Sequence, residues 1–102
     1  VYPPFLGAPA NSGVGLRKVD LVPSPGGWEM DFDALEKAVS PATRMFILCN
    51  PHNPVGRVFP ESTVAWIADF CRRHDLVFVS DEIHCDLLLD DLPHTSGLKF
   101  AG

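Results

Sequence analysis

The sequence lacks the signatures of several large classes of protein. None of its apolar runs is long enough to cross a membrane and no stretch has the pattern of a signal peptide, so we expect no membrane partner. The chain contains no G-x-x-x-x-G-K-[ST] loop, which P-loop nucleotide-binding proteins require. With 8 Lys and Arg residues against 13 Asp and Glu residues, its net charge of −5 argues against a nucleic-acid partner.

Cysteine is scarce, and its spacing does not suggest paired thiols. The three cysteines, Cys49, Cys71 and Cys85, are odd in number and form no C-x-x-C motif. Two of them fall within apolar patterns. We therefore interpret all three as reduced thiols and expect a cytoplasmic protein.

The composition is that of a folded domain. Of the 102 residues, 46% are hydrophobic and 21% are charged, which supports a packed core and argues against disorder. The chain opens at Val1 in a proline-rich stretch, and Lys99–Gly102 carry no helix stop signal. We expect an internal piece of a longer protein, with residues 1–102 forming the central part of one domain and no second domain.

Turn residues divide the first part of the chain into short elements. The expected order is loop, strand, turn and helix, over residues 1–13, 15–22, 23–27 and 33–39. The first loop leaves room for a short helical turn at 7–12. Asp31 is a suitable cap for the helix, and Pro41 ends it. The buried stripe of this helix is expected to comprise Phe32, Leu35 and Val39.

A βαβ unit is predicted in the second half of the chain. Two continuous apolar runs, Met45–Cys49 and Leu76–Val79, flank a helix that starts at Pro60. The helix carries an apolar stripe at i, i+3, i+4 and i+7, formed by Val64, Ile67, Ala68 and Cys71. Strands that are apolar throughout are typical of a parallel sheet covered on both faces. The predicted fold class is therefore α/β, with a right-handed crossover.

A polar segment follows each predicted strand. Asn50–Gly56 comes directly after the first strand, and its two prolines restrict the backbone around Asn53. Asp81 closely follows the second strand. Because the carboxyl ends of parallel strands meet at one sheet edge, both segments should face one crevice, where ligands of open α/β sheets bind. A partly desolvated carboxylate there needs a partner, which could be a cationic ring nitrogen, a metal ion or an arginine.

Each candidate residue also has an ordinary structural interpretation. Asn53 could donate to a ligand oxygen or cap its own turn. His84 could face the same crevice as Asp81, or be packed or simply exposed. Tyr2 lies before two prolines, so its ring could stack on a planar ligand or be an ordinary loop aromatic. Glu82 is interpreted as a structural carboxylate, or as one paired with a neighbouring subunit or helix, and is given no functional role.

Two other kinds of site fit the pattern less well. A metal site built from His52, Asp81, His84 and Cys85 has no ligand pair at a spacing typical of zinc, so we expect no metal. The strand end at 80–82 resembles the magnesium-binding strand of an NTPase, but the phosphate loop is missing. An NTPase-like or non-enzymatic α/β binding module is kept as the alternative of another class.

The two polar segments together resemble a known family. NPHNPVGRVF and SDEIHCDL, at Asn50–Phe59 and Ser80–Leu87, resemble the core of the fold type I pyridoxal-phosphate enzymes, the aspartate aminotransferase superfamily. They are most similar to its cystathionine β-lyase-like branch of carbon–sulfur lyases, which VYPPF and His94-Thr95 also fit. The resemblance covers essentially the whole chain. It implies a parallel-sheet, three-layer αβα piece of the large, cofactor-binding domain, with residues 1–102 in its central part.

The resemblance implies that four residues hold pyridoxal 5′-phosphate. Asp81 is similar to the carboxylate that pairs with the pyridine nitrogen of the cofactor. Asn53 is similar to the amide that donates to its phenolic oxygen. Tyr2 resembles the aromatic residue that stacks on the ring. His84 stands where many relatives have a tyrosine that binds the same phenolic oxygen.

The resemblance also implies an activity for the intact protein. That protein would be a homodimer that eliminates a thiol from a small amino acid, such as cystathionine or a cysteine conjugate, leaving pyruvate and ammonia. A class I/II aminotransferase is the close alternative, because the residues present here serve the cofactor and not the choice of reaction. We reject Lys99 as the Schiff-base lysine, because no Ser or Thr directly precedes it. This chain therefore supplies no catalytic residue and is expected to be inactive by itself.

Overall fold

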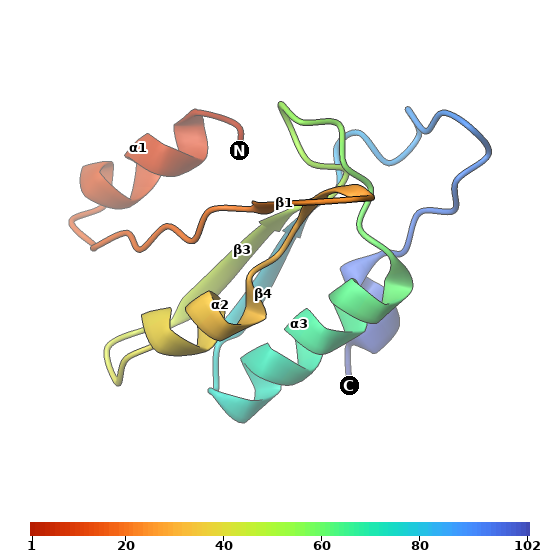
Figure 1. The fold of residues 1–102 in the computed structure, drawn as a ribbon. Coiled ribbons are helices and arrows are strands. Elements are labelled where there is room, and N and C mark those ends of the chain that lie inside the picture. The colour runs from red at the N-terminus through yellow and green to blue at the C-terminus, as the bar shows by residue number, and fades with distance from the viewer.

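A βαβ unit forms the centre of the structure (Figure 1). The computed structural model describes all 102 residues. The unit consists of strand β3 (Met45–Cys49), helix α3 (Glu61–Arg73) and strand β4 (Val77–Asp81). The remaining elements are α1 (Pro4–Asn11), β1 (Val22–Ser24), β2 (Gly27–Glu29), α2 (Phe32–Ala38) and the 3₁₀ helix η1 (Gly97–Phe100).

The two central strands are parallel, which confirms the prediction from their apolar runs. They pair in register from Met45 beside Val77 to Cys49 beside Asp81. The second strand therefore extends beyond the apolar run at 76–79. Asp81 is the last residue of β4, so its backbone is held by the sheet.

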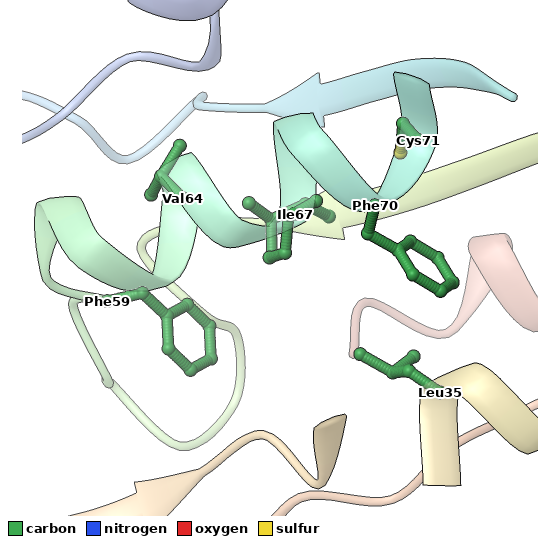
Figure 2. Close-up of a cluster of buried hydrophobic side chains, with 7 residues drawn as sticks. Leu35, Phe59, Val64, Ile67, Phe70 and Cys71 are labelled. Carbon is green, nitrogen blue, oxygen red and sulfur yellow. The ribbon is translucent and has the colours of Figure 1, made fainter. Parts of the chain in front are cut away.

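Helix α3 covers one face of this strand pair with the predicted apolar stripe. Val64 and Ile67 are fully buried, and Pro60 lies directly before the helix. Figure 2 shows side chains of α3 facing Leu35 of α2 and Phe59 of the preceding loop. The buried cluster comprises Leu35, Leu48, Phe59, Val64, Ile67, Phe70 and Cys71. The core of the chain thus lies between helices α2 and α3 on one side and one face of the β3–β4 pair on the other.

The opposite face of the strand pair is open in this chain. Met45 is 52% exposed and Val77 is 59% exposed, and Ile47 is exposed as well. Residues 1–102 by themselves therefore cover only one face of the strand pair. The physical reason is that a single crossover helix lies on only one face of the two strands that it joins.

Two expectations for the first part of the chain are wrong. Residues 15–21 form no strand, because no segment pairs with them; Val19 and Leu21 instead pack against the core. The alternation of apolar and polar residues in this segment therefore reflects the partial burial of Val19 and Leu21, although its backbone forms no hydrogen-bonded ladder. A short hairpin follows, in which β1 pairs antiparallel with β2 across the turn at Pro25-Gly26. The expected turn cluster is thus partly strand.

The other correction concerns the start of the chain. α1 replaces most of the expected loop at 1–13, and it includes residues 7–11 of the helical turn expected at 7–12. A proline in the first turn of a helix lacks only an N–H that would have no partner there, so Pro4 is tolerated. None of the helix residues is buried.

Helix α2 begins as its sequence predicts. Asp31 is the N-cap, and its Oδ1 accepts a hydrogen bond of 2.9 Å from the backbone N–H of Ala34. Leu35 is buried, while Phe32 and Val39 pack at the edge of the core, which confirms the expected stripe. No helix of the structure is both long enough and apolar enough to span a membrane.

Candidate functional site

The carboxyl ends of β3 and β4 bring the two polar segments together, as the parallel arrangement predicts. Cys49 lies beside Asp81 in the register. The backbone N–H of Asn50 continues the ladder by donating to the carbonyl of Asp81 over 3.0 Å. The loop Asn50–Gly56, called the asparagine loop below, and the segment that follows Asp81 therefore leave the sheet side by side.

The asparagine loop is closed by its own hydrogen bonds. Asn50 is completely buried, and its Oδ1 accepts a 3.0 Å bond from the backbone N–H of Phe59. His52 N–H donates to the carbonyl of Arg57 over 2.7 Å, and Gly56 N–H donates to the carbonyl of His52 over 2.8 Å. Gly56 has φ +68°, a conformation that favours glycine. Both Asn–Pro bonds are cis. The loop is thus held at both ends and across its middle.

Asn53 lies in the turn of this loop. It is half-buried, and its side chain takes part in none of the side-chain hydrogen bonds of the chain. The alternative in which Asn53 caps its own turn is therefore not what the structure shows. Its amide is free to donate to another molecule.

Asp81 lies at the end of β4 with no cationic partner. Its Oδ1 accepts a weak 3.3 Å bond from the N–H of Ile83, and none of the ion pairs of the chain includes it. Phe78 packs against the core, so alternation along the strand directs Asp81 away from α3. The arginine partner considered for this carboxylate is therefore not provided within the chain.

No side-chain hydrogen bond or ion pair joins His84 or Tyr2 to Asn53 or Asp81. His84 is half-buried in a turn, where its carbonyl accepts from Leu87 N–H over 2.9 Å and its ring makes no hydrogen bond. Tyr2 is 48% exposed, and its ring meets Phe5 edge-on at 5.9 Å. The assignments of both residues to a ligand remain predictions.

His52 is uncharged near neutral pH. Burial lowers the pKa of its imidazole. The ring lies edge-on to Phe59 at 6.2 Å. We therefore regard His52 as a packing residue of the loop. No group of three or more His, Cys, Asp or Glu side chains is arranged to hold a metal ion.

Glu82 is a structural carboxylate, as interpreted from the sequence, but its partners were not predicted. Its Oε1 accepts bonds of 2.7 Å from Ser80 Oγ and from Gly97 N, and its Oε2 lies 3.2 Å from His94 Nε2. Burial alone would raise the pKa of this carboxyl, but the hydrogen bonds from Gly97 and Ser80, together with the nearby side chains of His94 and Ser96, outweigh it and lower the pKa to about 2. Glu82 is thus ionised at every physiological pH. Only Ser80 is a sequence neighbour of Glu82. The other three residues lie more than ten positions further along the chain, so nothing in the local sequence signals them.

Lys99, which we rejected as the Schiff-base lysine, is engaged elsewhere. Its Nζ lies 2.7 Å from Glu61 Oε1, so it ties η1 to the first turn of α3. That placement puts it on the surface of the helical layer.

Comparisons with known proteins place the whole chain in one family. The family model for aminotransferases of class I and II matches residues 1–100. Cystathionine β-lyase PatB of Bacillus subtilis is 38% identical over 96 residues, which are 93% of this chain and 25% of that protein. The probable N-succinyldiaminopimelate aminotransferase DapC of Mycobacterium tuberculosis is 36% identical over 99% of this chain and 25% of its own length.

Solved structures agree with this result. Cystalysin from Treponema denticola, whose crystal structure contains pyridoxal 5′-phosphate, superposes with a TM-score of 0.89 at 35% identity. The match covers 96% of this chain and 25% of cystalysin. The chain spans about a quarter of the length of these relatives, and the predicted family and fold class are confirmed.

Proposed function

The chain belongs to the class I and II aminotransferase family, and from this premise we propose that the full-length protein is a pyridoxal-phosphate enzyme acting on a small amino acid. In this proposal residues 1–102 are the central part of the large, cofactor-binding domain. Cystalysin and the structural relatives that carry the cofactor support its identity.

One observation carries the proposal at the level of residues. Asp81 ends β4 as a carboxylate with no cation near it, beside a loop that presents the unbonded amide of Asn53. A desolvated carboxylate favours a cationic partner, and a free amide favours an oxygen acceptor. The protonated pyridine nitrogen and the phenolic oxygen of pyridoxal phosphate offer these two groups. The donor set therefore fits the cofactor.

Each residue then has a defined task. When bound, the cofactor acts as an electron sink for negative charge at the α-carbon of an amino acid. Asp81 would hold the proton on the pyridine nitrogen, on which that sink depends. Asn53 would bind the phenolic oxygen, and His84 would bind the same oxygen. Tyr2 would stack on the ring.

The same residues support two reactions. We propose a carbon–sulfur β-lyase that converts cystathionine or a cysteine conjugate to a thiol, pyruvate and ammonia, because PatB has the higher identity and cystalysin shares the fold. An aminotransferase is the second candidate, because DapC is nearly as similar. Assaying the full-length protein with cystathionine separates the two. Pyruvate released when no 2-oxo acid is added supports the lyase. Turnover that requires an added 2-oxo acid as amino acceptor supports the aminotransferase.

Asp81 provides the direct test of the cofactor assignment. Asp81→Asn in the full-length protein should weaken cofactor binding and reduce turnover at least a hundredfold, because the neutral amide cannot stabilise a protonated ring nitrogen. Asp75→Asn is the matched control, since Asp75 is an exposed aspartate just before the other end of the same strand. Equal cofactor affinity in both variants would refute the role of Asp81, and binding of a nucleoside triphosphate instead would favour the NTPase-like alternative.

We also propose that the full-length protein is a cytoplasmic homodimer. All three cysteines are free, which agrees with a reducing compartment. Light scattering of the purified protein tests the dimer, since a mass equal to one subunit at micromolar concentration would exclude it. Fractionation of the source cells tests the compartment.

A further inference from the structure

We propose that Glu82 is a positioning residue. Its carboxylate holds both ends of the loop 83–93 against the end of β4, and so fixes the backbone around Asp81 at the sheet edge where the cofactor is proposed to bind. The chain leaves the sheet after Asp81 and comes back into contact with this strand end at His94. Glu82 receives the returning segment through its 2.7 Å bond from Gly97 N and its 3.2 Å contact with His94 Nε2. One side chain thus joins the two ends of the loop.

The fit at the returning end is close enough to require glycine. A Cβ added at Gly97 would lie 3.0 Å from Ser80 Cβ and 3.2 Å from a ring carbon of Phe78. Gly97 is buried, so its backbone packs directly on the strand. Ser80 Oγ donates to the same Glu82 oxygen over 2.7 Å. The segment is therefore held against β4 by the packing of Gly97 and by Glu82 Oε1, which accepts hydrogen bonds from both Ser80 and Gly97.

The position of Glu82 gives this contact its functional consequence. Ser80 and Glu82 flank Asp81, and alternation along the extended chain directs their side chains opposite to that of Asp81. The two faces at this point therefore have separate tasks: one binds the returning segment, and the other presents Asp81. The loop that Glu82 closes also carries His84. This consequence rests on the proposed role of Asp81 and His84, whereas the closure of the loop does not.

Hydrogen exchange on the full-length protein without cofactor tests the closure. Glu82→Ala should speed exchange of the Gly97 amide at least tenfold and loosen residues 83–97, while α3 and β3 keep their protection. Glu82→Gln retains a neutral acceptor of the same shape, so its effect should be several-fold smaller. Glu61→Gln is the matched control: it removes the exposed carboxylate that pairs with Lys99 of η1 and should leave Gly97 exchange unchanged.

Cofactor affinity tests the functional consequence. Glu82→Ala should raise the Kd for pyridoxal phosphate roughly tenfold, and Glu82→Gln should restore most of the affinity. Unchanged exchange at Gly97 in both variants would overturn the proposal, as would equal loosening of α3 and β3. Open loops with unaltered cofactor affinity would refute the positioning role. The Asp81→Asn variant separates the two ideas, because unchanged cofactor binding in that variant refutes the proposed function while the closure by Glu82 still stands on the exchange data.

Discussion

Replacing Asn50 should open the asparagine loop from its buried end. Asn50 is completely buried, and its Oδ1 is the acceptor for the N–H of Phe59, itself 1% exposed. Asn50→Ala leaves this N–H buried without a partner, which costs about 1–3 kcal/mol. Because each 1.4 kcal/mol corresponds to a tenfold change, hydrogen exchange at Phe59 should accelerate by roughly 5- to 150-fold.

A second variant identifies the cause of that effect. Asn50→Asp keeps an acceptor near Phe59 N–H but introduces a buried carboxyl, whose pKa desolvation should raise. Its folded-state pKa would then exceed the unfolded value, so the loop should be protected at low pH and lose protection as pH rises through the folded pKa. Asn11→Ala is the control, because Asn11 is an exposed asparagine at the end of α1. Phe59 exchange within twofold of the wild type in Asn50→Ala would refute the reasoning.

Three further predictions concern the core and the charged side chains. Ile67→Ala should destabilise the fold by about 2–5 kcal/mol, measured by denaturant unfolding, because Ile67 is fully buried in the core. The pKa of Glu36, measured by NMR, should lie below its usual 4.5. Arg73→Gln should raise the pKa of Glu36, since the hydrogen bond from Arg73 is the largest cause of the lowering. The lowered pKa of Glu82, about 2, gives stability that is present above pH 4.5 and lost as pH falls through 2; Glu82→Gln should flatten this acid dependence.

The central elements could be predicted because their signals are local. The stripe from Val64 to Cys71 repeats at the helical period and faces the core as expected. Asp31 caps α2 through a bond to a residue three positions away, which short-range chemistry specifies. The run Met45–Cys49 coincides with β3. In each case the sequence neighbours are also the spatial neighbours that decide the structure.

The first part of the chain was predicted less well, for a different reason. Alternation at 15–22 is a good strand signal, but a strand also needs a partner, and residues 15–21 have none. Proline at 3 and 4 suggested loop, whereas proline is equally suited to the first turn of α1. A pattern of residue types cannot by itself distinguish these outcomes.

The candidate site divides along the same line. The sequence by itself determined the rigid Asn50–Gly56 loop, the aspartate at the strand end and their common sheet edge, because proline geometry and parallel strands leave little freedom. Only the tertiary structure decided that Asn50 anchors the loop and that Glu82 binds Gly97. Those contacts join residues 9 and 15 positions apart, and the path of the chain that brings such residues together depends on the packing of the whole fold.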